Sequence, residues 1–209
     1  MPESRNGNDN HLAVEERILA SARRMHNQSG YVATTMRQIA KDVGMEAQSL
    51  YNYFGSKQAI FAELTHRGTA ALRDAVEEAI AKAGDEPRAQ LWAAMKAHTT
   101  HYCDFEQVIL PRELLPHIDA ELRETIVTYL KSYEDIFKRI ITAGVAAGQF
   151  HEVDVSPTTF ALLGMGESVL NWYKPGGRLT AEQLGTQYAD HALSMLAGPD
   201  PRRHHTKGN

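Results

Sequence analysis

The amino-acid sequence predicts an all-α protein, and three observations support that prediction. Apolar residues recur at spacings of three and four along nearly the whole chain, which is the period of an amphipathic helix. No segment alternates apolar and polar residues as a half-buried strand does. Glycine, proline and hydroxyl residues fall where the periodic segments begin and end, which are the positions they favour in helical proteins. With 209 residues, the chain is also long enough to bury a core.

The first two helices are predicted from their apolar stripe and their ends. The first ends near residues 27–30, and its stripe has spacings of four, four and three, formed by Val14, Ile18, Ala22 and Met25. Thr34 and Thr35 then offer hydroxyl groups that cap a short helix over residues 36–43. Gly44 ends this second helix, because glycine tolerates the left-handed conformation of a helix C-terminus.

A third short helix covers residues 47–54, and six longer helical segments follow it, so the total is about nine. Ser56 caps the first of these segments. Pro111 and Pro116 interrupt another, since each removes a backbone hydrogen-bond donor. In chain order, the six segments span residues 57–83, 91–102, 105–118, 120–147, 157–173 and 180–196.

The composition excludes several classes of protein. The longest stretches of low charge are shorter than the roughly eighteen residues that a membrane-spanning helix needs. The single cysteine, Cys103, excludes a disulfide framework and a typical thiolate metal site. Residues 1–10 are polar and lack the apolar run of a signal peptide, so we expect a cytoplasmic protein.

The charge is distributed unevenly along the chain. The net charge is −4, but residues 1–67 hold eight basic and seven acidic residues and therefore carry +1. This distribution indicates that the N-terminal part is the one that meets an anionic partner.

Residues 34–57, TTMRQIAKDVGMEAQSLYNYFGSK, have the pattern of a helix-turn-helix. Its packing skeleton consists of two short helices joined by a glycine turn, with Ile39, Ala40, Gly44, Leu50 and Phe54. The other face of the second helix carries compact hydrogen-bonding groups that suit base edges or phosphate oxygens, namely Gln48, Ser49, Tyr51, Asn52 and Tyr53.

This segment resembles the TetR family of transcriptional repressors. It contains T-x-x-x-I-A-x-x-x-G followed by L-Y-x-Y-F-x-S-K, and the resemblance covers residues 12–65. The resemblance implies a repressor that binds a palindromic DNA operator as a homodimer and is released by a small hydrophobic effector. It implies no cofactor, no bound metal and no membrane partner.

The resemblance also implies roles for individual residues. Thr35 corresponds to a phosphate-binding position, and Arg37 lies where a side chain reaches the groove. The base-reading residues are then Gln48, Ser49 and Asn52, and the phosphate contacts come from Tyr51, Tyr53 and Lys57. Because Lys57 opens a helix, we expect its charge and the free helix N–H groups to face the DNA backbone together.

The last two helices are the expected dimer surface. Between Val155 and Tyr173, Glu167 is the only charged residue before the loop, and a helix that is apolar on every side must be buried on every side. The predicted interface consists of Phe160, Leu163, Leu170, Leu184, Tyr188, His191, Ala192 and Met195. The alternative is a monomer whose last two helices are well buried.

In the family, the middle helices enclose a pocket for the effector. Apolar walls with a few hydroxyl groups suit a hydrophobic ligand. The predicted lining residues are Trp92, Met95, Tyr102, Phe105, Arg112, Tyr129, Tyr133, Phe137, Met165 and Trp172. Taken alone, each of them is more often ordinary core than ligand wall, because aromatic stripes also build cores, so only their number favours a pocket.

Residues 172–180, WYKPGGRLT, are similar to a subgroup of the family that controls fatty-acid and sterol catabolism, whose effectors are often acyl-CoA thioesters. Arg112 could meet a carboxylate or phosphate of such a ligand, and Lys174 and Arg178 its nucleotide end. The alternative is that all three are solvated surface cations.

The residues alone are also compatible with two other functions. His98 and His101 are spaced so that they could hold a metal in a helical-bundle enzyme, with a further ligand from Glu113, His117 or Glu167. No HExxH motif, glycine-rich phosphate loop or G-x-S-x-G turn supports an enzyme. The other possibility is a regulator that binds a protein instead of DNA.

The predicted organisation has four parts. Residues 1–11 form a disordered arm, residues 12–56 a helix-turn-helix domain, residues 57–198 a ligand-binding and dimerisation domain, and residues 199–209 a disordered tail. The helix that begins at Lys57 joins the two domains.

Overall fold

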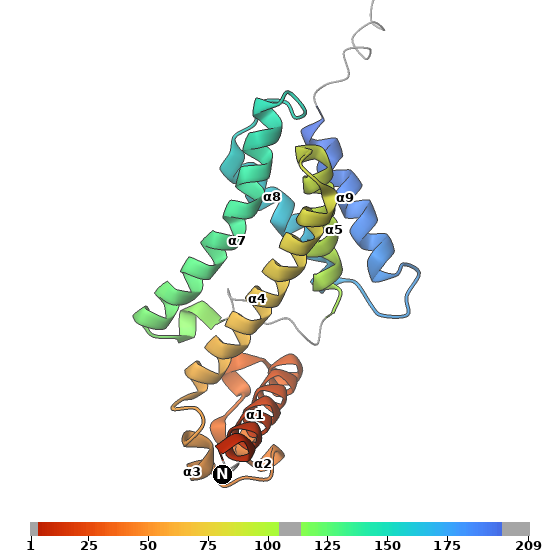
Figure 1. Ribbon diagram of the computed structural model, residues 1–209. Helices are drawn as coiled ribbons and strands as arrows, with labels where there is room; N and C mark the ends of the chain where they lie inside the picture. Colours follow the sequence, from red (N-terminus) through yellow and green to blue (C-terminus); the bar gives the residue numbers. More distant parts are fainter. Residues whose placement is uncertain (1–3, 105–113, 198–209) are drawn as a thin grey trace, which may run out of the picture. The chain divides into compact units, whose positions relative to one another are not determined.

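The computed structural model describes residues 4–104 and 114–197, and these residues form an all-helical fold, as predicted (Figure 1). They make eight α-helices and two short 3-10 helices. The elements are α1 Ser4–Ala33, α2 Met36–Asp42, α3 Ala47–Tyr51, α4 Lys57–Ala83, α5 Pro87–Tyr102, η1 Leu115–His117, α7 Ala120–Ala146, α8 Val155–Glu167, η2 Ser168–Asn171 and α9 Ala181–Leu196. No described helix combines the length and the apolarity that crossing a bilayer requires.

The chain divides into two compact units, and each boundary falls inside a long helix. The described residues up to Gly68 and those from 114 to 128 form the first unit, and those from Thr69 to 104 and from Tyr129 to 197 form the second. The divisions therefore lie within α4 and α7.

Helix α1 begins earlier than predicted. It begins at Ser4, so the described part of the arm expected to be disordered is helical. The reason is that adding residues to an existing helix needs no new nucleation, and no proline interrupts residues 4–33. Gly30 lies where the stop was predicted, and its non-helical φ of 80° interrupts the regular helix there; residues 31–33 are a short continuation beyond this kink.

Helices α3 and α8 are shorter than predicted. Helix α3 ends at Tyr51, and α8 ends at Glu167 and continues as η2. In α8, two glycines weaken the helix, and the Ser168 hydroxyl donates to the Met165 carbonyl at 2.6 Å, which competes with the helical pattern. Pro116 lies within η1, whereas Pro111 and the predicted C-terminal tail lie outside the described residues.

The first unit buries one face of each of its four N-terminal helical segments. Figure 1 shows α1, α2 and α3 gathered around the first turns of α4. The core side chains are fully or almost fully buried and include Ile18, Leu19, Ala22, Ile39, Leu50, Ile60 and Phe61. Burying aliphatic and aromatic side chains of this size contributes about 1.5–3 kcal/mol each, which holds the short helices α2 and α3 in place.

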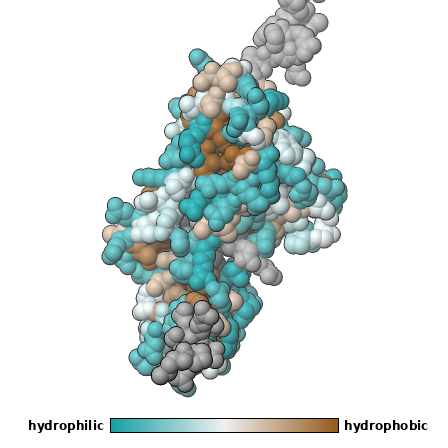
Figure 2. All heavy atoms as spheres, viewed as in Figure 1, coloured by the Kyte–Doolittle hydropathy of each residue, from teal (hydrophilic) through white to brown (hydrophobic). Residues whose placement is uncertain are grey.

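The second unit is built around α5, which packs along α9 and against α8. A Cβ atom on Gly185 of α9 would lie 2.3 Å from the Thr100 Oγ1 atom of α5, so glycine permits this close approach. The core is apolar and includes Leu72, Val76, Leu91, Met95, Phe137, Ile141 and Leu162. Helices α4 and α7 also border a cavity of about 790 Å³, and Figure 2 shows apolar surface recessed among hydrophilic residues in this region.

Candidate nucleic-acid interface

Helix α2 begins with a complete capping box. The Gln38 backbone N–H donates to the Thr35 hydroxyl oxygen at 3.3 Å, and the Thr35 backbone N–H donates to the Gln38 side-chain oxygen at 2.9 Å. This confirms Thr35 as the N-cap. Thr34 has a different role, because it is buried and its hydroxyl donates to the Gly30 carbonyl at 3.0 Å. It thereby ties the end of α1 to the start of α2.

The turn between α2 and α3 depends on Gly44. Its φ of 73° lies in the left-handed region that favours glycine. The Met45 N–H donates to the Ala40 carbonyl at 2.8 Å, which closes the C-terminus of α2. Helix α3 then buries Leu50 completely, and no side chain caps its N-terminus at Glu46. Packing of Leu50 therefore holds this five-residue helix in place.

Helix α1 anchors the C-terminus of α2 through polar contacts. The Arg17 guanidinium donates to the Val43 carbonyl at 2.6 Å. The Ser21 hydroxyl donates to the Asp42 carboxylate at 2.6 Å, and Arg24 donates to the same carboxylate. The Ser21 hydrogen bond, and then the charge of Arg24, lower the pKa of Asp42. Side chains of α1 thus fix the helix-turn-helix to α1.

Most of the predicted DNA-binding residues are exposed at the start of α2, on α2, on α3 or directly after α3. Arg37, Gln48 and Asn52 are exposed, and Tyr51 is 46% exposed. Thr35 is exposed at the start of α2, and Ser49 is half-buried. The side chains of Gln48, Tyr51 and Asn52 form no hydrogen bond with any described residue. Their polar groups are therefore free to bind another molecule.

Lys57 and Tyr53 differ from the prediction, because each has a partner within the first unit. The Lys57 ammonium group donates to the Tyr31 carbonyl at 2.9 Å and lies 4.0 Å from the centre of the Tyr31 ring. Desolvation by burial lowers the pKa of Lys57. The Tyr53 ring stacks on His11 with 4.6 Å between ring centres. Lys57 thus does not present its charge outward, and Tyr53 is in part a packing residue.

Sequence reasoning missed Lys41 as a residue of this surface. Lys41 is exposed on α2, and it follows Arg37 by four residues, so the two side chains share one helix face. Neither cation forms an ion pair with a described residue. The i, i+4 spacing of two basic residues beside the turn was the signal that could have revealed it.

The predicted dimer surface is partly exposed and partly buried within the chain. Phe160 is 55% exposed, Met195 is 45% exposed and His191 is exposed. Leu163, Leu170 and Tyr188 are half-buried. The prediction was wrong for Leu184 and Ala192, which are 1% and 0% exposed. They lie on the face of α9 that packs within its own unit, and an apolar stripe does not reveal which surface covers it.

The predicted effector pocket maps mostly onto the core of the second unit. Met95, Tyr133 and Phe137 are buried core residues, and Trp92, Tyr102 and Met165 pack against that core. Tyr129 is half-buried. Trp172 is 49% exposed, so it is not an internal wall as predicted, because the helix ends at Asn171 before it. Phe105 and Arg112 lie outside the described residues.

A buried polar group at the centre of this unit joins three helices. The His98 Nδ1 atom lies 2.6 Å from the Tyr133 hydroxyl, and Nε2 lies 3.0 Å from the Leu163 carbonyl oxygen. Because a carbonyl only accepts, Nε2 carries the proton and Nδ1 accepts from Tyr133. Burial lowers the pKa of His98 to about 4. Burial also raises the pKa of the Tyr133 hydroxyl.

This arrangement removes His98 from the metal-site alternative, whose further candidate Glu113 lies outside the described residues. Both nitrogens of His98 already have partners, so neither is available as a ligand. Among the described residues, no three His, Cys, Asp or Glu side chains lie together as a metal site requires.

Comparisons with known proteins agree with the helix-turn-helix. The family model "Bacterial regulatory proteins, tetR family" matches residues 18–64, and "Tetracyclin repressor-like, C-terminal domain" matches residues 84–196. The transcriptional repressor KstR2 of Rhodococcus jostii (strain RHA1) is 29% identical over 188 residues, which cover 87% of this chain and 90% of KstR2.

Two solved structures extend the likeness to the whole fold. The TetR family regulator PfmR from Thermus thermophilus has a TM-score of 0.77 and 28% identity, and the match covers 88% of this chain and 100% of PfmR. AibR in complex with isovaleryl coenzyme A and operator DNA has a TM-score of 0.77 and 26% identity, covering 90% of this chain and 100% of AibR. The chain therefore belongs to the TetR family of DNA-binding transcriptional regulators and is not an enzyme.

Proposed function

We propose that this regulator represses transcription by binding a palindromic operator as a homodimer, and that a small hydrophobic effector releases it. The observation that carries the DNA-binding part is the exposed face of α3, where polar side chains without described partners lie above the buried anchor Leu50. A surface that is polar, unpaired and rigidly supported is what a reading helix in a major groove needs.

The contacts divide into reading and positioning groups. The amides of Gln48 and Asn52 each offer a donor and an acceptor, which match the major-groove edge of adenine. Thr35, Arg37 and Lys41 lie around the start and the exposed face of α2, where they supply phosphate contacts. Helix α3 has no lysine or arginine, so sequence recognition rests on amide and hydroxyl groups.

Selection of bound sequences from a random DNA pool tests this proposal. We expect an inverted repeat, because two symmetric subunits read two half-sites about one helical turn apart. Gln48→Ala and Tyr51→Ala should each weaken binding of the selected site at least tenfold, whereas Gln28→Ala, on an exposed part of α1, should not. Recovery of no enriched sequence would favour a regulator that binds protein instead of DNA.

The dimer part of the proposal rests on the exposed apolar residues of α8 and α9. Phe160 and Met195 leave large apolar surfaces in water, which a second copy of the chain would cover. Phe160→Glu should therefore shift the protein toward monomer in sedimentation measurements. Glu152→Gln, an exposed change just before α8, serves as the control.

The effector part draws on the relatives. AibR was crystallised with isovaleryl coenzyme A, and KstR2 is a transcriptional repressor of similar length. An acyl-CoA or lipid-like metabolite is accordingly the effector class that we propose, with the exposed cations Lys174 and Arg178 available to an anionic nucleotide.

Release from DNA requires that the effector bind the DNA-free conformation more tightly than the DNA-bound one. Equal affinity for both conformations would leave the equilibrium between them unchanged. A series of acyl-CoA thioesters should include at least one that dissociates the protein from the selected DNA. The concentration that releases half of the bound DNA should depend on the length of the acyl chain. Free coenzyme A should release none.

A further inference from the structure

A groove in the second unit has the features of a ligand site separate from the predicted effector lining. It has a volume of about 860 Å³, which is within the range of small-molecule sites. Its walls come from the end of α4, the start of α5, Gln149 after α7 and Leu193 of α9. Of the ten residues predicted to line the effector pocket, it includes Trp92 alone.

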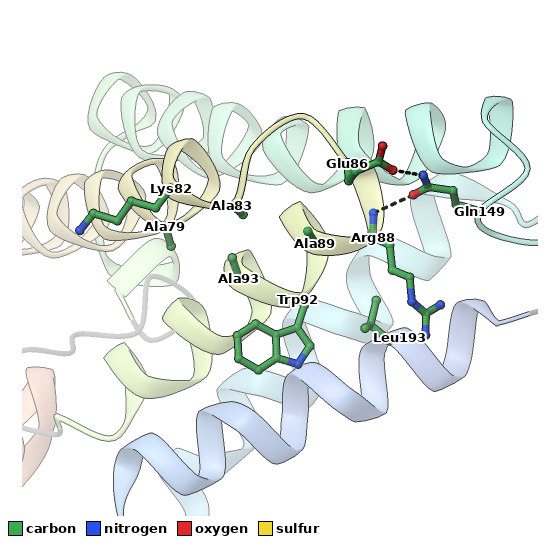
Figure 3. Close-up of a pocket in the computed structure, with 10 residues that line it drawn as sticks. All are labelled: Ala79, Lys82, Ala83, Glu86, Arg88, Ala89, Trp92, Ala93, Gln149 and Leu193. Atoms are coloured by element: carbon green, nitrogen blue, oxygen red, sulfur yellow. Dashed lines mark hydrogen bonds between the residues drawn. The ribbon is translucent and has the colours of Figure 1, made fainter.

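The groove exists because short side chains face each other where α4 and α5 meet. Ala79 and Ala83 of α4 and Ala89 and Ala93 of α5 line it (Figure 3). Methyl groups cover the helices without filling the space between them, so an apolar concavity remains. Transferring an apolar chain from water to such a surface is favourable by roughly 25 cal/mol per Å².

Two walls of the groove are held in place by hydrogen bonds. The Trp92 indole N–H donates to the Asp190 carboxylate of α9 at 2.8 Å. Gln149 bridges the start of α5, because its side-chain oxygen accepts from the Arg88 backbone N–H at 3.0 Å and its amide donates to the Glu86 carboxylate (Figure 3). A site with fixed walls loses less conformational entropy when a ligand binds.

The charged groups at the groove differ in their partners. Lys82 is paired with Glu78 at 2.6 Å, whereas the Glu86 carboxylate keeps its negative charge and is held by the neutral amide of Gln149. The Arg88 side chain is exposed and forms no ion pair with a described residue. In Figure 3, it extends from α5 toward α9. A guanidinium beside an apolar surface matches a ligand with an anionic head and an apolar chain.

We propose that this groove binds an amphipathic anion, with the chain against the four alanines and Trp92 and the head group on Arg88. Carboxylate and phosphate head groups share the required chemistry, since the guanidinium donates two parallel hydrogen bonds to either. The proposal does not depend on the effector or on DNA binding.

Tryptophan fluorescence provides a direct test. The chain has two tryptophans, so the full-length Trp172→Phe protein reports on Trp92 alone. We would titrate it with decanoate, decyl phosphate and 1-decanol, each below the concentration at which it aggregates. Saturable changes with decanoate or decyl phosphate at least tenfold tighter than with 1-decanol are expected, and the better of the two anions identifies the head group. Equal affinity for 1-decanol and both anions would overturn the proposal.

Variants locate the binding. Arg88→Ala should weaken binding of the anion at least fivefold and leave the affinity for 1-decanol unchanged. Arg88→Lys keeps a positive charge, so it should retain part of the preference for the anion over 1-decanol. Ala93→Leu should abolish binding of all three compounds by filling the groove, and a thermal melt establishes that it remains folded. The matched controls Lys131→Ala and Ala147→Leu are exposed positions outside the groove and should bind normally. Anion binding that survives both Arg88→Ala and Ala93→Leu would place the ligand elsewhere and overturn the proposal.

Discussion

His98 shows how a single buried side chain makes stability depend on pH. Its pKa is lowered to about 4 by burial, whereas the imidazole of an unfolded chain has an ordinary pKa near 6.5. Between these values the unfolded state binds more protons, so the free energy of unfolding falls as pH falls through that interval. Above the unfolded pKa, the contribution of His98 to stability is complete and constant.

We therefore predict that the protein loses about 2 kcal/mol of stability between pH 7.5 and pH 5 through His98, at about 1.4 kcal/mol per pKa unit. Urea unfolding at the two pH values measures it. His98→Gln offers a similar donor and acceptor without titrating, so it should reduce the difference, whereas His66→Gln, at an exposed position, should not. An unchanged pH dependence in His98→Gln would contradict the prediction.

Gly166 lies against the same imidazole. A Cβ atom there would be 2.3 Å from His98 Cδ2, which is too close, and nothing lies within 4 Å of a Cβ on Gly164. Gly166→Ala should therefore destabilise the fold by about 1–3 kcal/mol through overpacking. Gly164→Ala should be neutral or stabilise it by about 0.5–1 kcal/mol, since alanine favours the helix. Chemical denaturation measures the free energy of unfolding of both variants. Equal changes in Gly166→Ala and Gly164→Ala would refute the prediction.

At the scale of elements, the capping box of α2 makes a measurable contribution to the free energy of unfolding. The helix has only seven residues, so the loss of one cap removes a large part of its local stabilisation. Thr35→Ala should cost about 1 kcal/mol of stability, and Thr35→Ser should cost much less because the hydroxyl remains. Urea midpoints of the two variants check this. Equal urea midpoints for Thr35→Ala and Thr35→Ser would show that packing alone defines the start of α2.

The same elements show what sequence can predict. Thr35, Gly44 and Leu50 were predicted correctly because their roles follow from neighbours within a few residues: a cap, a left-handed turn and an apolar period. The inward orientation of Lys57 was not predictable in this way, since its acceptor Tyr31 is 26 residues away.

The second unit was harder to predict for a related reason. The apolar stripe on α9 includes both the buried Leu184 and the exposed Met195, and its spacing alone does not tell the two apart. The groove beside Trp92 was also hidden, because it arises from alanines on two helices and no spacing within one helix signals it.

At the scale of the whole molecule, phosphate contacts predict how DNA binding depends on salt. A handful of phosphate contacts per subunit should give a slope of roughly −4 to −9 in a plot of log affinity against log salt for the dimer, at about −0.9 per phosphate. Fluorescence anisotropy with the selected operator measures this slope. An affinity independent of salt would contradict the assignment of DNA as the partner.

Removing one positioning cation should change that slope by a defined amount. Lys41→Ala removes a contact from each subunit, so the slope should become shallower by about 2 for the dimer. Lys131→Ala, an exposed change on α7, should leave it unaffected. If both variants gave the wild-type slope, Lys41 would not contact DNA.

Different residues in and next to α3 support the helix and face outward, and this separation has an evolutionary consequence. Leu50 supports the helix from below, while Gln48, Tyr51 and Asn52 make no hydrogen bond to the described part of the chain. Mutations at these three surface positions can then alter operator preference at little cost in folding free energy. Duplicated copies of such a gene can thus acquire new target promoters before any compensating change in the scaffold is needed.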